Sequence, residues 1–419
     1  MDKKQNKNRL FENIISLSSL QFATYLLPLI TVPYLVRVLG PEKFGLIAFA
    51  QALIQFFVFF TDYGFNLSAT RKIAVNKDDK DSISRIFSSV MFIKTILTIL
   101  SFFILACLVM LIPKFKAYLL VYFFSFGIVI GHSLFPLWYF QGIERMKYIA
   151  SINVLARLIF TFSIFIFVRN SNDYLFVPIL NSLGFIIAGI VSLYVVFFKF
   201  NVIPRFVGLK DIYEDLKEGW YCFLSTVSIS FYTSSSTLML GIFTTNTVVG
   251  YYSAAEKIIR AILRIFTPFS QSIYPYISNI ANQSREKGLK FLKKTNAYFI
   301  LGSFIISLFC FIYAQQIVLL LLGPQYKESI LVFRMLAMLP FITGIATVYA
   351  QFYLLGFGYI KELARILLVS AFLNIILCFI FIHFMSLGGI GAALSWIVTE
   401  LFVLSASYFF YRRTVYADR

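Results

Sequence analysis

The stretch Tyr251–Arg264 reads YYSAAEKIIRAILR and places four charged residues inside a long run of apolar ones. Glu256, Arg260 and Arg264 follow one another at intervals of four, so they share one face of a helix. Lys257 points about 100° around the helix from Glu256. Glu256 can pair with Arg260, which leaves Lys257 and Arg264 as cations in need of a counter-ion.

The chain around this stretch is far more apolar than a soluble protein. Of its 419 residues 59% are hydrophobic and 13% are charged, whereas soluble domains are about 25% charged. The pattern therefore predicts an all-α integral membrane protein. About twenty apolar residues cross a bilayer, and this length predicts twelve transmembrane helices, at residues 13–36, 44–65, 87–112, 117–140, 148–168, 174–198, 219–241, 249–279, 296–322, 329–355, 362–385 and 389–411.

The formal charge of +18 follows from membrane topology and requires no nucleic-acid partner. Of the 37 Lys and Arg residues, 25 fall in the termini and connections that share one side of the predicted membrane, and 6 fall on the other side. Because positive charge is enriched on the cytoplasmic side, this distribution predicts that both termini are cytoplasmic.

The remaining six cations lie within predicted spans, where only three acids accompany them. A charge at the centre of a bilayer costs about 2.5–3.5 kcal/mol, so each should face a cavity or a partner. The cations, as candidates to bind an anionic headgroup, are Lys94, Arg157, Lys257, Arg260, Arg264 and Arg334. An ion pair or a snorkelling side chain is the alternative interpretation for each of them.

The three acids at membrane depth are Asp62, Glu256 and Glu400, and they are candidates to couple transport to an ion. Glu256 is the strongest of them, because a carboxylate between cations could release or capture a proton when an anion enters. Its alternative role is to be the counter-ion of Arg260. For Asp62 we expect a helix cap or a pair with Arg71.

Two patterns recur at an offset close to half the chain length, which predicts an internal repeat. The first recurs at an offset of 214, as Tyr139-x-x-Gly142-x-x-x-x-Lys147-x-x-Ala150-x-Ile152 and Tyr353-x-x-Gly356-x-x-x-x-Lys361-x-x-Ala364-x-Ile366. The second recurs at 205, as Gly45-x-x-Ala48-x-Ala50-Gln51 and Gly250-x-x-Ser253-x-Ala255-Glu256. An even number of spans in each half makes the repeats parallel. We therefore predict two pseudo-symmetric six-helix bundles, residues 1–208 and 209–419.

The link between the predicted halves contains an apolar stripe at helical spacing. Leu209, Ile212, Tyr213 and Leu216 follow the order i, i+3, i+4, i+7, with charged residues between them. This spacing predicts an amphipathic helix that lies on the cytoplasmic membrane surface.

The predicted span 219–241 is rich in hydroxyl side chains. Ser228, Thr233 and Ser235 are candidates to contact the hydroxyl groups of a sugar. Small hydroxyl residues also line helix–helix contacts in membranes, and both interpretations stay open.

Catalytic and metal-binding patterns are missing from the sequence. It contains no Walker A motif, zinc-type histidine pair, nucleophile elbow or metal-ligand spacing of its four cysteines. No connection between spans is long enough for a soluble catalytic domain. We expect a transporter without a metal or cofactor, not an enzyme, whose energy source, if it uses one, is an ion gradient.

Four stretches complete the pattern: Val38-Leu39-Gly40-Pro41-Glu42-Lys43-Phe44-Gly45, Thr61-Asp62-Tyr63-Gly64, Ser68-Ala69-Thr70-Arg71-Lys72-Ile73-Ala74 and Gly250-Tyr251-Tyr252-Ser253-Ala254-Ala255-Glu256-Lys257. Together they resemble the polysaccharide-transporter family, whose best-known members are Wzx-type O-antigen flippases. That family belongs to the MOP superfamily with multidrug MATE exporters and lipid II flippases. The resemblance covers nearly the whole chain.

The resemblance implies twelve helices in two MATE-like bundles around a V-shaped, cation-lined cavity. It implies a substrate of a few sugars on undecaprenyl diphosphate, moved from the cytoplasmic to the periplasmic leaflet of a bacterial inner membrane. Coupling to a proton or sodium gradient, alternating access, and a polysaccharide polymerase and chain-length regulator as partners belong to the same expectation. Arginine and lysine suit the diphosphate, and hydroxyl groups suit the sugars.

Three alternative functions fit the sequence less well. A MATE-like exporter of cationic drugs should have an acidic cavity, whereas here six cations within spans accompany three acids. A polymerase or ligase of the same pathway should have a substantial periplasmic loop. A lipid II flippase also resembles the chain but usually has two more spans.

Overall fold

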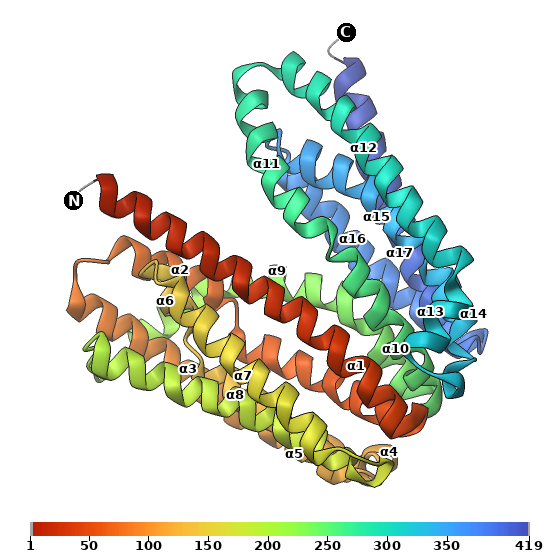
Figure 1. Ribbon diagram of the computed structural model, residues 1–419. Coiled ribbons are helices and arrows are strands. Elements are labelled where there is room, and N and C mark those ends of the chain that lie inside the picture. Colours follow the sequence, from red (N-terminus) through yellow and green to blue (C-terminus); the bar gives the residue numbers. More distant parts are fainter. Residues whose placement is uncertain (1–2, 418–419) are drawn as a thin grey trace. The chain divides into compact units, whose positions relative to one another are not determined.

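The computed structural model describes the backbone of residues 3–417 and the side chains of residues 27, 29–224, 235–271 and 273–415. Its described backbone consists of helices and their connections and contains no strand. The chain folds into two compact units, residues 1–31 with 50–230, and residues 32–49 with 231–419. Figure 1 shows the helices of each unit. The prediction of 1–208 and 209–419 differs from this division, because both α1 and α9 continue from one unit into the other.

The first unit is built from helices of the first half of the chain. They are α1 (Lys3–Asp62, without residues 32–49), α2 (Phe65–Val75), α3 (Lys80–Leu111), α4 (Pro113–Lys116), α5 (Leu119–Leu134), α6 (Leu137–Gly142), α7 (Met146–Phe167) and α8 (Phe176–Tyr194), with a 3-10 turn at Ser171–Leu175 and a π-helical turn at Val195–Lys199. The first part of α9, up to residue 230, also belongs to this unit.

The second unit takes residues 32–49 of α1 and the second half of the chain. Its other elements are α9 (Leu209–Phe243, from residue 231), α10 (Asn246–Leu263), α11 (Phe266–Gln283), α12 (Arg285–Ile312), α13 (Ala314–Leu321), α14 (Ser329–Leu336), α15 (Leu339–Thr347), α16 (Ile360–Cys378) and α17 (Gly388–Ala417), with a 3-10 turn at Pro324–Tyr326 and π-helical turns at Val348–Leu355 and Phe379–Phe384.

Nine segments of the described residues are long and apolar enough to cross a membrane, which makes the chain a multi-pass membrane protein. They are residues 29–75, 80–111, 119–142, 146–167, 171–199, 285–312, 329–355, 360–384 and 388–415. The predicted spans 13–36 and 219–241 fall partly on side chains outside the described range. The predicted span 249–279 corresponds to α10 and α11, and its four charged residues lie on α10 and at the C-cap of that helix. The count of twelve transmembrane helices stays a prediction.

Left-handed backbone conformations set the ends of the first helices. Gly40 has φ of +72° and bends α1 between the predicted spans 13–36 and 44–65. Tyr63 (φ +44°) and Gly64 (φ +74°) end α1 and begin α2. Glycine adopts positive φ at little cost because it has no Cβ atom, whereas Tyr63 is strained there.

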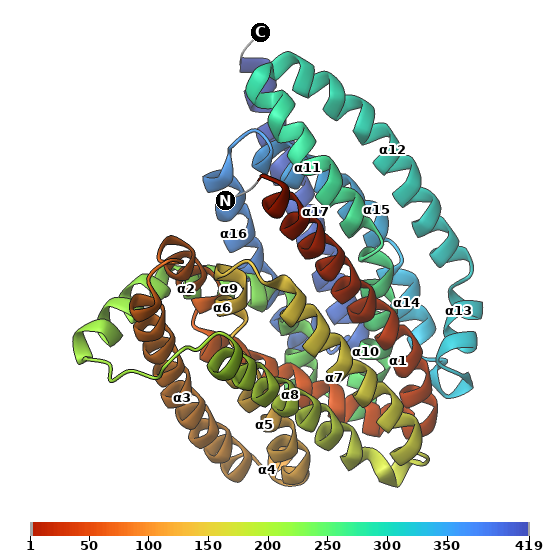
Figure 2. The ribbon, with the colours of Figure 1, turned by 60° about the vertical axis from the view of Figure 1, so that its left-hand side comes forward.

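Small residues allow the helices of the first unit to pack closely. Gly127 and Gly131 on α5 face α8, where a Cβ atom on Gly127 would lie 2.6 Å from the Ser182 Cβ atom. Gly189 on α8 faces α5 in return, and its Cβ atom would lie 2.7 Å from that of Leu134. Figures 1 and 2 show the two helices side by side. Small residues four apart are a common device for close helix packing in membranes.

The second repeated pattern forms a pseudo-symmetric contact inside the second unit. A Cβ atom on Gly45 would overlap the carbonyl oxygen of Asn246, and one on Gly250 would overlap the carbonyl oxygen of Pro41. The offset of 205 relates Pro41 to Asn246 and Gly45 to Gly250, so each contact is the repeat partner of the other. The two glycine-bearing segments therefore pack backbone to backbone.

The first repeated pattern also occupies equivalent places. Gly142 ends α6 and packs on Ile73 of α2, with 2.5 Å between a Cβ atom built on Gly142 and the Ile73 Cγ2 atom. Gly356 follows the π-helical turn and packs on Ile277 of α11, with a corresponding distance of 3.1 Å. Each glycine thus lets the end of one helix approach an isoleucine in its own unit.

The predicted amphipathic helix forms the first part of α9, but its apolar stripe is divided between two environments. Ile212 and Leu216 pack against the core of the first unit. Leu209 and Tyr213 are 86% and 66% exposed. The expectation that the whole stripe lies on the membrane surface is wrong for Ile212 and Leu216, because tertiary packing covers them.

We expect Gly45→Ala to lower the stability of the protein by about 1–3 kcal/mol, because the added methyl group overlaps the Asn246 backbone. Gly302→Ala on α12 is the matched control, since a Cβ atom there meets nothing within 4 Å. Thermal unfolding in detergent, followed by intrinsic fluorescence, measures both variants. Equal unfolding temperatures for the two variants would contradict the packing argument.

Candidate functional site

Glu256 on α10 is a buried carboxylate that three donors hold. The Nε and Nη2 atoms of Arg260 donate to its Oε1 atom at 2.9 and 2.7 Å. The Oγ1 atom of Thr237 on α9 donates to Oε2 at 3.0 Å. The guanidinium of Arg260 also lies 4.5 Å from the ring centroid of Trp396 on α17. The pair predicted from the spacing is present, and it joins three helices of the second unit.

Thr237 and Trp396 contribute to this cluster although the sequence pattern did not single them out. Thr237 belonged to the hydroxyl-rich run, but the run does not tell which hydroxyl faces a carboxylate. The indole of Trp396 lies 136 positions beyond Arg260 in the chain. Only the packing of α17 against α10 brings the two together.

Lys257, one residue after Glu256, has different surroundings. Its ammonium lies 4.9 Å from the ring centroid of Phe44, which belongs to the same unit. The neighbouring carboxylate of Glu256 is already bound by Arg260 and Thr237. Among the described side chains Lys257 makes no ion pair. Arg264, at the C-cap of α10, is exposed.

Ser235 belongs to a neutral polar network between α9, α16 and α17. Its hydroxyl donates to the Oδ1 atom of Asn374 at 2.7 Å, and the amide of Asn374 donates to Thr399 at 3.1 Å. Ser235, Asn374 and Thr399 are all buried. This geometry is that of a helix–helix contact. Ser228 and Thr233, the other two candidates for sugar contact, lie outside the described side chains.

Glu400 follows Thr399 on α17 and is 7% exposed, so it is buried to the same extent as Glu256. The described residues contain no group of three His, Cys, Asp or Glu side chains that could hold a metal ion. The polar centre of the second unit therefore combines hydroxyl and amide groups with the pair of Glu256 and Arg260.

Lys94 on α3 is 1% exposed and is paired within the first unit. Its Nζ atom donates to the Oδ1 atom of Asp62 at 2.9 Å and to the carbonyl oxygen of His132 at 3.2 Å. The expected pair of Asp62 with Arg71 is wrong, because Asp62 at the end of α1 points to α3. Arg157 of α7 belongs to the same unit and, like Asp62 and Lys94, lies in the neighbourhood of His132.

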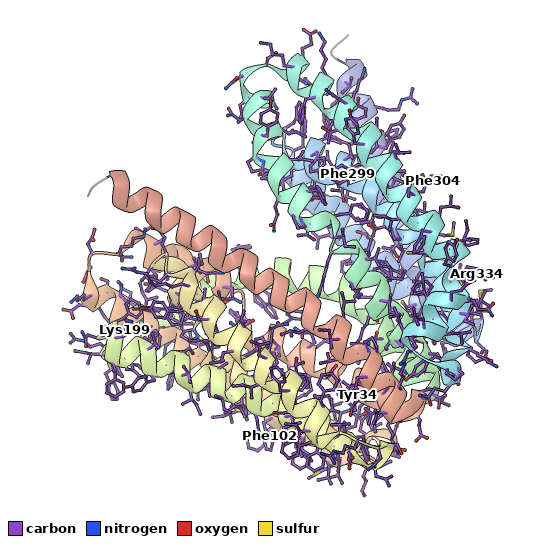
Figure 3. All side chains as sticks on the ribbon, viewed as in Figure 1. Tyr34, Phe102, Lys199, Phe299, Phe304 and Arg334 are labelled. Carbon is purple, nitrogen blue, oxygen red and sulfur yellow. The ribbon has the colours of Figure 1, made fainter. Side chains whose placement is uncertain are left out.

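Arg334 lies on the last turn of α14 in the second unit, where Figure 3 labels it. Its guanidinium is 5.8 Å from the ring centroid of Phe311 on α12. Lys257 and Arg334 thus have aromatic partners, whereas Arg260 and Lys94 have carboxylates. The six predicted cations do not share one kind of environment.

A groove of about 860 Å³, with both charged and apolar residues in its lining, lies in the first unit between α2 and the beginning of α9. Lys72 joins its walls by pairing with Asp215 at 2.6 Å and with Glu218 at 3.1 Å. Tyr63 and Phe223 stack nearby with ring centroids 5.0 Å apart. These contacts dock the first turns of α9 on the helix break at Tyr63.

We expect Lys94→Met to destabilise the protein by about 3 kcal/mol, because it leaves the Asp62 carboxylate without its cation. The double variant Lys94→Met/Asp62→Asn removes both charges and should regain most of that loss. Thermal unfolding of the purified variants measures the difference. A double variant as unstable as the single one would contradict a charge-pair origin.

We expect Thr237→Val to cost about 1.5–3 kcal/mol of stability, since the buried carboxylate of Glu256 loses a hydroxyl donor. Thr237→Ser keeps the hydroxyl group and should retain the unfolding temperature to within a few degrees. The fluorescence of Trp396 is expected to report the loosened Arg260 stack in the valine variant only.

Comparisons with known proteins agree with this architecture. A family model described as "Polysaccharide biosynthesis protein" matches residues 10–281. A protein of Escherichia coli (strain K12) named "Putative O-antigen transporter" is 33% identical over 407 residues, which cover 97% of this chain and 98% of the relative. A protein of Shigella dysenteriae with the same name is 28% identical over 393 residues, covering 94% and 98%.

Solved structures share the fold at low sequence identity. The lipid II flippase MurJ in an inward closed conformation matches with a TM-score of 0.70 and 15% identity, over 95% of this chain and 87% of its own. An inward-facing multidrug resistance MATE transporter of the MOP superfamily matches with a TM-score of 0.69 and 15% identity, over 97% and 98%. Both likenesses confirm the predicted MATE-like fold class.

Two of these findings assign the family. The family model covers more than half of the chain, and the Escherichia coli relative is 33% identical over 97% of it. The all-α membrane fold agrees with the assignment. The chain belongs to the polysaccharide biosynthesis protein family and is a multi-pass membrane transporter, not an enzyme.

Proposed function

We propose that the protein is a flippase for an undecaprenyl-diphosphate-linked oligosaccharide, the repeat unit of an O-antigen, capsule or exopolysaccharide. It moves this lipid from the cytoplasmic to the periplasmic leaflet of a bacterial inner membrane by alternating access. The names of the two O-antigen transporter relatives support this substrate class. The observation that carries the proposal is that Lys257 makes no ion pair among the described side chains, because Glu256 pairs with Arg260.

Lys257 is a cation on α10, and the acid next to it in the chain, Glu256, forms its ion pair with Arg260. Glu256 accepts from Arg260 and Thr237, and the described partner of Lys257 is the Phe44 ring. A cation–π contact of this kind is worth about 0.5–2 kcal/mol, which is less than the free energy of several kcal/mol that desolvation of an ammonium group costs. A diphosphate that approaches Lys257 supplies the missing negative charge.

The chemistry of a lipid diphosphate fits the other cations as well. Arg260 presents a guanidinium whose orientation Glu256 and Trp396 restrict, which lowers the entropy lost when it binds an anion. Arg157 and Lys94 both belong to the first unit, where Lys94 pairs with Asp62. Arg264 and Arg334 complete the proposed set of headgroup contacts.

Coupling to a proton or sodium gradient is part of the proposal, and the acids differ in how well they suit it. Glu256 and Asp62 each have a cation partner, which supports a counter-ion role for both. Glu400 on α17 is buried and stays a coupling candidate with them. Both termini are proposed to be cytoplasmic, and a polysaccharide polymerase and a chain-length regulator are proposed partners.

A lipid II flippase and a MATE-like drug exporter are the alternative functions, since both share the fold. The substrate that accumulates without the protein separates them. Deletion should leave the lipid-linked repeat unit in the inner leaflet, which mass spectrometry of the lipid extract identifies. Accumulated lipid II, or normal surface polysaccharide with increased sensitivity to cationic drugs, would replace the proposed function with one of the alternatives.

We expect Lys257→Gln to reduce transport at native expression by about tenfold to a hundredfold, because a charge-assisted hydrogen bond is worth about 1.5–3 kcal/mol. Lys257→Arg keeps the charge and should retain most of the activity. Lys327→Gln, an exposed lysine of the same unit, is the control. Surface polysaccharide and inner-leaflet repeat unit are measured for each variant. Full transport by Lys257→Gln would remove Lys257 from the binding site.

A further inference from the structure

The charged ends of the two units differ in their balance of cations and acids. In the first unit the connecting segments 71–85, 144–147 and 199–218 contain eleven cations and eight acids. In the second unit the corresponding segments 285–294, 361–365 and 412–413 contain nine cations and two acids. Among these segments, the larger excess of cations over acids therefore belongs to the second unit.

Ion pairs repeat this contrast. In the first unit Lys72 pairs with Asp215 and Glu218, Lys77 pairs with Glu144, and Arg205 pairs with Asp81. In the basic segments of the second unit, Lys290 pairs with Glu286 at 2.7 Å, and both side chains are exposed. Exposed pairs of this kind are weak. The acids of these segments are too few to neutralise their cations.

Tertiary contacts gather these basic segments at one end of the second unit. The Nη2 atom of Arg285, at the start of α12, donates to the carbonyl oxygen of Thr414 near the end of α17 at 3.1 Å. Tyr359, just before α16, lies edge to face on Phe410 of α17 with ring centroids 5.2 Å apart. Figures 1 and 2 show the beginning of α12 beside the end of α17.

Helix α12 connects this basic end to a surface that must face hydrocarbon. Lys287, Lys290, Lys294, Tyr298, Leu301, Ile305, Leu308 and Ile312 follow one another at intervals of three or four residues, and all are exposed. The opposite face of α12, with Leu292, Phe299 and Ser303, is buried. Figure 3 shows Phe304 and Phe299 on this helix.

The length of the stripe places its lysines at the depth of lipid headgroups. From Lys294 to Ile312 the helix rises about 27 Å, close to the thickness of about 30 Å of a bilayer's hydrocarbon core. Tyr298 stands one turn inside Lys294, where aromatic residues mark the membrane interface. The exposed ammonium group of Lys294 therefore lies near the depth of the lipid phosphates, and that of its neighbour Lys293 is also exposed. Lys287 starts about 10 Å further out on the same face, from where its long side chain can reach back toward the headgroup. Lys290, between them, pairs with Glu286.

We propose that Lys287, Lys293 and Lys294 bind the phosphate of an anionic phospholipid whose acyl chains lie along the exposed stripe of α12. The ligand is a resident lipid of the leaflet at this end of the protein, not the transported substrate. Its negative charge compensates cations that the few acids of these segments cannot neutralise. In the compared segments of the first unit, acids balance the cations more closely.

The test uses the full-length protein in nanodiscs of phosphatidylcholine with a minor fraction of phosphatidylglycerol of the same acyl chains. Native mass spectrometry counts the phosphatidylglycerol molecules that stay bound after release from the disc. Each lysine near an anionic surface contributes about fivefold to binding, so Lys287→Gln/Lys293→Gln/Lys294→Gln should weaken it by roughly a hundredfold. Raising the salt concentration should weaken wild-type binding, because exposed charges are screened.

Lys80→Gln/Lys210→Gln/Lys217→Gln is the control, since it removes three exposed lysines from the acid-rich segments of the first unit. It should bind phosphatidylglycerol as the wild type does. The triple arginine variant at 287, 293 and 294 should keep binding, which separates a charge effect from misfolding. The proposal is overturned if the glutamine triple variant binds like the wild type, or if the control variant loses binding equally.

Discussion

A charge inside an apolar helical bundle must find a partner within hydrogen-bond reach, and this constraint organises both units. Desolvation of an ion costs several kcal/mol, which only close oppositely charged or hydrogen-bonding groups offset. Lys94 meets it with Asp62 and the His132 carbonyl, tying α3 to the ends of α1 and α5. Arg260 pairs with one carboxylate oxygen of Glu256, and the other oxygen accepts a hydrogen bond from the hydroxyl group of Thr237. Lys257 has an aromatic ring instead, so it is the residue whose charge best suits an incoming anion.

Close backbone packing supplies the second constraint, because it leaves no space for side chains at particular positions. Gly45 and Gly250 occupy repeat-related positions and each meets the other segment's backbone. This contact holds residues 32–49 of α1 in the second unit, although they belong to the first half of the sequence. Gln51 stands where the repeat has Glu256, so the charge cluster of α10 is a specialisation of one half.

Several features could be predicted from residue pattern and spacing alone. The all-α membrane class follows from long apolar runs, and the pair of Glu256 with Arg260 follows from their separation of four residues. The partner of Asp62 could not be predicted, because Lys94 lies on another helix, whereas Arg71 was near in sequence. Helical spacing predicts a membrane-surface position for Ile212 and Leu216, but both pack on the protein core, because apolar side chains at this spacing suit protein and lipid equally well.

The sequence by itself determined what depends on composition and local period: the membrane class, the helical architecture, the internal repeat and the surplus of cations over acids. The tertiary structure alone decided which of those cations is neutralised, since carboxylates, hydroxyls and aromatic rings reach them from distant parts of the chain. Trp396 on Arg260 and Phe44 on Lys257 illustrate this, because both partners are more than a hundred residues away. Electrostatic pairing depends on distances of a few ångströms, and such distances arise only when the helices pack.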